Sequence, residues 1–179
     1  KTLNMDMLKC FFSNRYAGRT ELFEGLSVWQ EEKYRSLQGS YPVIYLTFAD
    51  IKADSYEDSK NSIIAVINEA YQAHRYLLES DAVTDGEKNL FKAFDEYTNN
   101  SDSDKEIANE VVFRSLKVLS DCLCRYYNKK VIILLDEYDT PMQEAYVYGY
   151  WEEMTSFLRN LFNATFKTNK YCIDGLPNR

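Results

Sequence analysis

The chain has 179 residues, of which 45% are hydrophobic and 27% charged, and its formal net charge is −7. This length and composition are typical of one globular domain with its own core. Nucleic-acid binding depends on clustered Lys and Arg, so we expect no direct nucleic-acid binding by this acidic segment. No apolar run approaches the roughly 20 residues that cross a bilayer, so we expect no membrane partner.

The first predicted element is an amphipathic helix at the start of the chain. In the stretch TLNMDMLKCFF, apolar residues recur at helical spacing, at Leu3, Met7, Leu8, Phe11 and Phe12. The turn-rich stretch SNRYAGRTELFEGL comes next, so we expect the helix to end near Ser13.

Two continuous apolar runs predict two strands. The first covers residues 43–48 (VIYLTF) and the second residues 131–136 (VIILLD), whose last residue is acidic. Both runs are rich in β-branched or large apolar residues, which is typical of strands that are covered on both faces. Because helical patterns separate them, we expect an α/β fold with a parallel sheet flanked by helices.

Helical patterns occupy the stretch between the two strands and the stretch after them. From Ser55 onward, one stripe carries Ile63, Ile67, Ala70, Tyr71 and His74, and we interpret the histidine as a packed side chain. Capping boxes at residues 84–87 (TDGE) and 103–106 (SDKE) each predict the start of a helix. Residues 151–166 (WEEMTSFLRNLFNATF) form a further helical pattern.

The cysteines and the single histidine do not form a zinc-binding pattern. The cysteines are Cys10, Cys122, Cys124 and Cys172. Zinc sites need Cys and His ligands at regular spacing, which one histidine and these positions do not provide. We expect reduced thiols in a cytoplasmic protein, because no signal-peptide pattern precedes them.

Two adjacent carboxylates, Asp136 and Glu137, stand at the carboxyl end of the second predicted strand. In open parallel sheets, ligands bind outside this end of the strands. Acids in this position also cap or form salt bridges at loops, so both a structural and a functional interpretation are open. At the other end of the chain, Lys1 and Thr2 directly precede a helix, as in the last two residues of the phosphate-binding motif GxxxxGK[ST].

Taken together, these motifs resemble the AAA-ATPase-like family of P-loop proteins, which is often fused to a PD-(D/E)XK nuclease-like domain. The resemblance covers nearly the whole chain, and its most specific part is LLDEYDTP. The other matching stretches are KTLNMDMLKCFF, LFEGL, YPVIYLTF and FLRNLFNATFKTNKY. By position, the resemblance implies that Lys1 is the Walker A lysine and Thr2 its magnesium-binding hydroxyl. It likewise implies that Asp136 is the Walker B aspartate and Glu137 the general base.

The resemblance implies ATP and Mg²⁺ as cofactors, and ATP hydrolysis coupled to an unknown activity of a larger protein. Magnesium prefers hard oxygen ligands, and phosphoryl transfer depends on positioning and charge neutralisation. Two alternatives to an ATP-hydrolysing function remain open. One is a nucleotide-dependent regulatory switch, and the other is a non-catalytic interaction domain. The expected partners are a nuclease-like domain in the same chain and further copies of the protein.

The sequence departs from the family pattern at both ends. No glycine-rich loop precedes Lys1, and the closing stretch CIDGLPNR does not read as the family's sensor strand. We therefore expect residues 1–179 to be a partial P-loop domain that is inactive alone and whose bare sheet edge favours association. Arg159 is a candidate arginine finger, but a solvated or Glu-paired arginine is the simpler interpretation.

Overall fold

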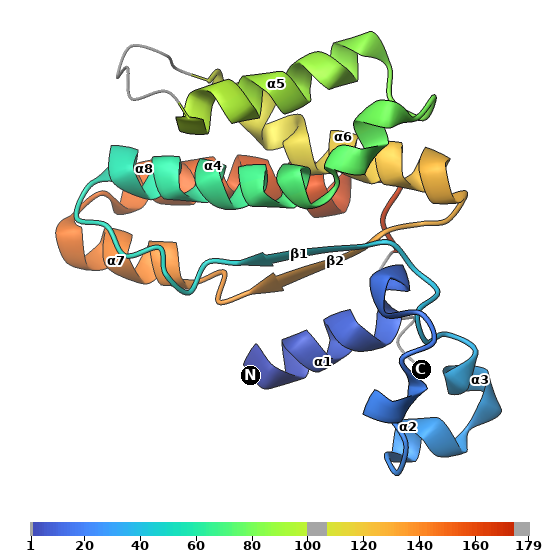
Figure 1. Ribbon diagram of the computed structural model, residues 1–179. Coiled ribbons are helices and arrows are strands. Elements are labelled where there is room, and N and C mark those ends of the chain that lie inside the picture. The colour runs from blue at the N-terminus through green and yellow to red at the C-terminus, as the bar shows by residue number, and fades with distance from the viewer. Residues whose placement is uncertain (1, 100–106, 174–179) are drawn as a thin grey trace.

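The computed structural model describes residues 2–99 and 107–173, which form a mostly helical α/β fold (Figure 1). Its two strands are β1 (Val43–Thr47) and β2 (Ile132–Asp136). The helices, in chain order, are α1 (Thr2–Phe12), α2 (Ser27–Gln30), α3 (Glu32–Arg35), α4 (Tyr56–Ala73), α5 (Asp85–Asn99), α6 (Asn109–Tyr127), α7 (Thr140–Tyr148) and α8 (Trp151–Phe162). Each of these helices is too short or too polar to span a membrane.

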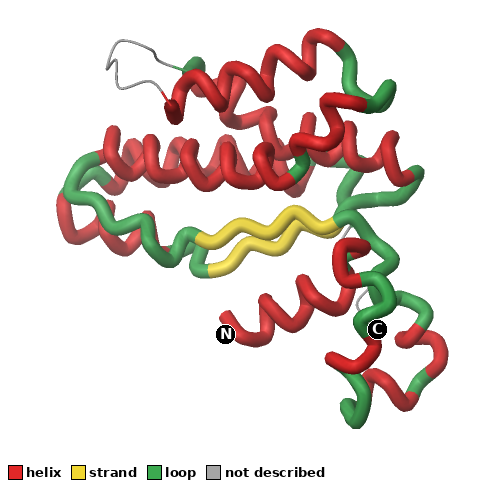
Figure 2. Tube along the Cα trace, in the orientation of Figure 1, coloured by secondary structure: helices red, strands yellow, loops and turns green. Residues whose placement is uncertain are grey.

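The two strands pair in parallel, as the sequence predicts, with Val43 opposite Ile132 and Thr47 opposite Asp136 (Figure 2). The Ile132 N–H donates to the Pro42 carbonyl and the Phe48 N–H donates to the Asp136 carbonyl, both at 3.0 Å. In a parallel pair, alternate residues of each strand bond to the partner. The backbone N–H and C=O groups of the even-numbered residues of β1 and β2 therefore form the hydrogen bonds between the strands. Those of the odd-numbered residues point away from the partner strand.

Different layers cover the two faces of this small sheet (Figure 1). On one face, Ile44 and Leu46 join the main core together with residues of α4, α6 and α8. On the other face lies α1, whose Lys9 ammonium is 4.9 Å from the centre of the Tyr45 ring. Residues 132–135 of β2 are all half-buried, although they alternate between the two faces of the sheet. The prediction that both strands are covered on both faces is wrong for β2.

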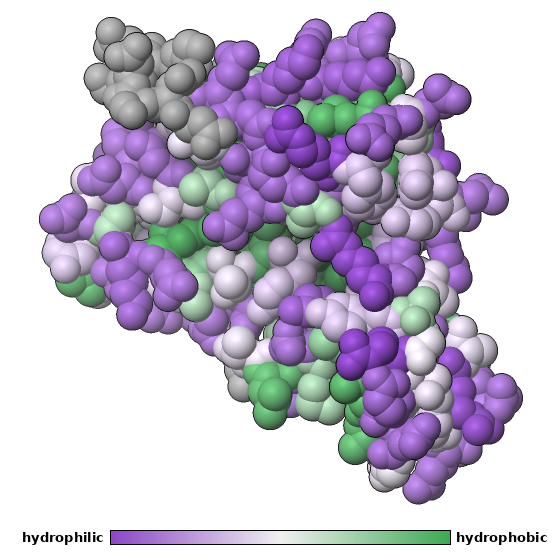
Figure 3. Space-filling model, viewed as in Figure 1, coloured by the Kyte–Doolittle hydropathy of each residue, from purple (hydrophilic) through white to green (hydrophobic). Residues whose placement is uncertain are grey.

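Helix α1 itself has an uncovered apolar side. Leu3, Met7 and Leu8 are 72%, 43% and 42% exposed. Figure 3 shows hydrophobic surface in the lower part of the view, where Figure 1 draws α1 and the segment after it. Exposed apolar surface of this kind favours association, so the expectation of a partner for this side stays a prediction.

The buried stripe of α4 agrees with the sequence pattern. Ile63, Ile67 and Tyr71 are fully buried, and the Tyr71 hydroxyl donates to the Ser115 carbonyl of α6 at 2.7 Å. His74 directly follows α4 and is 5% exposed, with its Nδ1 at 2.8 Å from the Ala70 carbonyl oxygen. Its interpretation as a packed histidine is confirmed.

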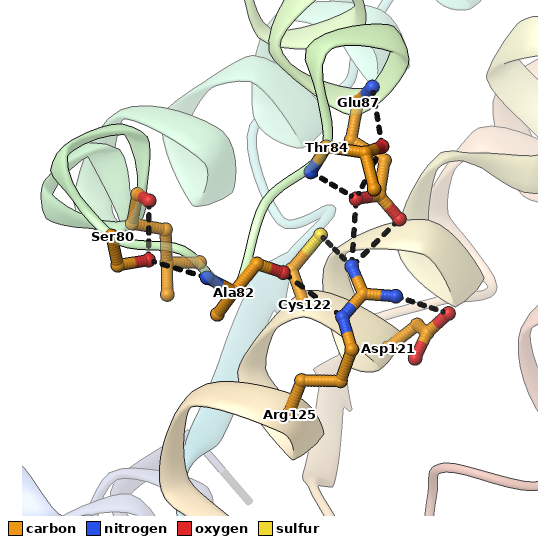
Figure 4. Close-up of polar contacts among 8 residues, drawn as sticks. Ser80, Ala82, Thr84, Glu87, Asp121, Cys122 and Arg125 are labelled. Carbon is orange, nitrogen blue, oxygen red and sulfur yellow. Dashed lines mark hydrogen bonds and ion pairs between the residues drawn. The ribbon is translucent and has the colours of Figure 1, made fainter.

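The capping box at residues 84–87 forms as predicted and also links two helices (Figure 4). The Thr84 N–H donates to the Glu87 carboxylate at 2.8 Å, and the Glu87 N–H donates to the Thr84 hydroxyl at 3.4 Å. Arg125, near the end of α6, donates to both oxygens of the same carboxylate at 2.7 and 2.8 Å. Its guanidinium also reaches Asp121 and the Ala82 carbonyl. One arginine thus joins the start of α5 to the end of α6.

One predicted boundary, the start of α6, differs from the structure. The second capping box lies outside the described residues, and α6 begins only at Asn109 after a non-helical Ala108, so the prediction that this box opens α6 is wrong. Pro141 lies in the first turn of α7, a position that suits proline because the N–H groups of the first turn have no partner within the helix. Cys172 forms an isolated parallel bridge with Val131, directly before β2, and residues 174–179 of the closing stretch lie outside the described residues, so the expectation that this stretch is not the sensor strand stays a prediction.

Burial of His74 makes the stability of the fold depend on pH. Burial lowers the pKa of His74 from 6.5 to about 4; the hydrogen bond to Ala70 opposes this shift, and the charge of Arg15 adds to it. Between these two values the unfolded chain binds a proton that the folded chain does not. The contribution of His74 to the free energy of unfolding should therefore be constant above pH 6.5 and fall by about 3 kcal/mol as the pH drops from 6.5 to 4.

Urea denaturation at several pH values tests this dependence. His74→Asn keeps a side-chain donor but removes the titrating group. Its loss of stability between pH 6.5 and 4 should therefore be smaller than that of the unmodified protein by about 3 kcal/mol. Parallel curves for the two proteins would contradict the assignment.

Candidate functional site

Asp136 is a buried carboxylate with one oxygen that has no partner among the described residues. It is the last residue of β2 and is 1% exposed. Its Oδ1 accepts a hydrogen bond from the Glu137 N–H at 3.1 Å, whereas Oδ2 has no hydrogen-bond partner among the described residues. A buried charge without a partner costs free energy. Such a cost is typical of an oxygen that binds a ligand.

The register of the sheet brings Thr47 next to this carboxylate. Thr47 is the strand partner of Asp136, so their side chains lie on the same face of the sheet. The Thr47 hydroxyl accepts a hydrogen bond from the Ala49 N–H at 3.3 Å and can still donate a proton. Sequence reasoning missed Thr47 because only the strand register connects it to Asp136.

The face that carries Asp136 is the face that α1 covers. Tyr45 lies on this face, and burial raises the pKa of its phenol. The next largest cause of this shift is the negative charge of Asp136, and the carboxylate of Asp6 in α1 raises the pKa further. Asp136 and the first half of α1 therefore act electrostatically on the same phenol.

Glu137 adopts a left-handed backbone conformation, with φ of 49°. This region costs a non-glycine residue roughly 1–2 kcal/mol, and such strain is concentrated at functional sites. The Thr140 N–H donates to the Glu137 carbonyl at 3.1 Å, which holds the turn from β2 into α7. The side chain of Glu137 is half-buried, and its carboxylate makes no hydrogen bond or ion pair with any other described residue.

The opening residues of the chain are only partly described. Lys1 lies outside the described residues, and Thr2 is the exposed first residue of α1. Figure 1 shows α1 beginning on the side of the sheet to which both strand arrows point. Thr2, Asp136 and Glu137 thus lie toward the same end of the sheet, although Thr2 makes no hydrogen bond with the other two. Arg159 lies on the exposed side of α8.

The donor set fits magnesium better than zinc or calcium. Among residues 2–99 and 107–173, no three His, Cys, Asp or Glu side chains come together as a metal cage. Magnesium needs no such cage, because one or two carboxylates with waters and substrate phosphates complete its octahedron. Asp139 is a second acid at this junction, with a buried Oδ1 that has no described partner and an Oδ2 that accepts from Gln143.

The unpaired oxygen of Asp136 predicts that the fold becomes more stable when this charge is removed. In Asp136→Asn, the neutral side chain keeps Oδ1 for the Glu137 N–H and removes the buried charge. We expect an increase of about 1–3 kcal/mol in the free energy of unfolding, measured with EDTA present. The matched change Asp50→Asn, at an exposed position, should have no effect. A loss of stability in Asp136→Asn would mean that an unseen partner satisfies the carboxylate.

Comparisons with known proteins identify one family. No curated protein and no solved structure matches the chain. The family described as "Predicted AAA-ATPase" matches residues 1–174, which include the candidate site and every described helix and strand. The chain therefore belongs to this AAA-ATPase-like family.

Proposed function

We propose that the protein to which these residues belong binds ATP and hydrolyses it with Mg²⁺, and that hydrolysis is coupled to a further activity. The observation that carries this proposal is the buried Asp136 carboxylate, with its unpartnered oxygen at the carboxyl end of β2. Membership of the AAA-ATPase-like family supports nucleotide use in general.

Four residues take roles in this proposal. Asp136 is the Walker B aspartate and holds magnesium through Oδ2, directly or through a water. Thr2 supplies a hydroxyl ligand to the same ion, and Lys1 pairs with the β- and γ-phosphates. Magnesium, when bound, neutralises the charge that develops on the transferred phosphoryl group. The first turn of α1 contains no acidic residue, which supports an anion at its N-terminus.

Glu137 is the general base in this proposal. Its carboxylate follows directly after the metal ligand and makes no other interaction with the described residues, so it is available to accept a proton from the attacking water. The left-handed backbone turns this side chain away from the strand alternation that sets the direction of Asp136. A positioned base contributes about 10²–10⁴-fold to the rate.

The proposal extends to the protein's surroundings. The four free thiols support a reducing compartment such as the cytoplasm. The exposed apolar side of α1 supports a covering partner, either a further domain of the same chain, such as the nuclease-like domain often found in this family, or another copy.

A glutamine substitution of the base tests the proposal in the full-length protein. In Glu137→Gln, ATP hydrolysis should fall by about 10²–10⁴-fold, whereas ATP affinity should change by no more than a few-fold. Steady-state phosphate release and equilibrium nucleotide binding measure the two effects. The control is Glu152→Gln, an exposed acid in the first turn of α8, which should leave both unchanged.

The possible outcomes separate the three candidate functions. Unchanged hydrolysis in Glu137→Gln would exclude this glutamate as the base. Nucleotide binding without measurable turnover in the unmodified protein would favour a regulatory switch. Nucleotide binding that survives Asp136→Ala would favour an interaction domain in which the two acids are structural.

A further inference from the structure

A cavity of about 350 Å³ runs along the edge of β1 that faces away from β2. One wall comes from Lys9 of α1 and from Ser13, which directly follows α1. The other wall comes from α4, including Ala70 and Ala73. Residues 43 and 45–47 of β1 line it between these walls. We call this cavity the β1-edge groove. Its volume lies within the range of roughly 300–1,000 Å³ that is typical of ligand-binding pockets.

The strand presents unused hydrogen-bonding groups to the β1-edge groove. The even-numbered residues of β1 pair with β2, as the bond from the Phe48 N–H to the Asp136 carbonyl indicates. The N–H and C=O groups of Val43, Tyr45 and Thr47 therefore point to the other side, where the same three residues line the groove. Backbone groups of this kind at a sheet edge are a template for another strand.

The chain itself occupies the first position of such a strand and then leaves it. Ser13 pairs in parallel with Tyr41, just before β1. The Tyr41 N–H donates to the Phe12 carbonyl at 2.9 Å, and the Asn14 N–H donates to the Tyr41 carbonyl at 2.8 Å. The backbone then turns into a short 3₁₀ helix (Asn14–Tyr16). The next positions that such a strand would occupy, beside Val43 to Thr47, lie in the cavity.

We propose that the β1-edge groove binds an extended peptide segment of another protein, which adds to β1 as a strand. A second copy of the sheet does not fit as the occupant, because α1 and α4 wall the groove on both faces and would collide with the helices of that copy. A single extended chain is thin enough to lie between these walls. Main-chain hydrogen bonds then give affinity, and alternate side chains give specificity.

The two walls define the chemistry of the peptide. The side chains of an added strand alternate between them. The wall formed by α1 and the residues after it carries two basic groups, Lys9 and Arg15. Lys9 forms an ion pair with Asp6, and the Arg15 guanidinium donates to the Ala73 carbonyl of the opposite wall, so an acidic peptide would exchange these contacts for its own. The α4 wall carries the small side chains of Ala70 and Ala73, with the acidic Glu69. The groove therefore favours a peptide in which acidic residues alternate with apolar ones, the acidic residues facing α1.

Amide hydrogen exchange in the full-length protein, read at single residues, tests the proposal. The probe is the peptide acetyl-Val-Glu-Val-Glu-Val-amide, and acetyl-Val-Lys-Val-Lys-Val-amide is its charge-reversed control. At a saturating concentration of the acidic peptide, the amides of Tyr45 and Thr47 should exchange at least about tenfold more slowly, whereas those of Ile44 and Leu46 should not change. The basic peptide should bind at least about tenfold more weakly than the acidic one.

Two alanines of α4 provide a matched pair of variants. Ala73 and Ala65 are both exposed, but only Ala73 lines the groove. Ala73→Phe should fill the groove and lower the affinity for the acidic peptide about tenfold or more. Ala65→Phe should change this affinity less than about twofold. Equal melting temperatures for the two variants verify that both fold.

Several results would overturn the proposal. One is the absence of selective protection at Tyr45 and Thr47 with the acidic peptide at millimolar concentration. Another is equal binding to the two alanine variants. A third is protection of these two amides before any peptide is added, which would mean that the chain itself fills the groove or, if the protection depends on protein concentration, that a second copy does.

Discussion

The parallel pairing of β1 with β2 is the constraint on which the rest of the structure depends. It fixes Thr47 opposite Asp136 and so puts a hydroxyl and a buried carboxylate on one face at the carboxyl end of the sheet. The same pairing uses the even-numbered backbone groups of both strands and leaves the odd-numbered groups of β1 pointing toward the β1-edge groove. The candidate metal site and the groove are thus two consequences of one register.

The unequal covering of the two faces determines where charge is tolerated. The face against α4 is continuous with the main core and is apolar at every described position of the two strands. The face against α1 carries Tyr45, Thr47 and Asp136, and it is less deeply buried. A carboxylate at the end of β2 is accepted only on this second face, where a cation can approach it and compensate for its desolvation.

Sequence periodicity was sufficient to predict the strands, the main helices and the packed His74, because each depends on local patterns that burial enforces. The Thr84 box was predictable because both of its partners lie within four residues. The start of α7 at Thr140 was not predictable, since a proline such as Pro141 is common both in turns and in the first turn of a helix. The half-burial of β2 and the role of Thr47 depend on contacts between distant segments, which no local pattern records.

For the candidate site, the sequence suggested Asp136 and Glu137 from their place after an apolar run. It did not predict that one Asp136 oxygen lacks a partner within residues 2–99 and 107–173, or that Glu137 has a left-handed backbone. Both features arise from how the chain turns from β2 into α7. They distinguish a carboxylate that is available to a ligand from one that caps a helix.

In the proposed function, the Asp136 carboxylate holds a divalent metal ion beside a bound nucleotide. The most direct measurement is titration of the full-length protein with Mn²⁺, in the presence of a non-hydrolysable ATP analogue, followed by electron paramagnetic resonance. Asp136→Asn should weaken Mn²⁺ binding by about tenfold or more, whereas Asp139→Asn, at a neighbouring acid whose Oδ2 accepts from Gln143, should retain it. Equal Mn²⁺ affinity in the unmodified protein and in Asp136→Asn would exclude Asp136 as the metal ligand.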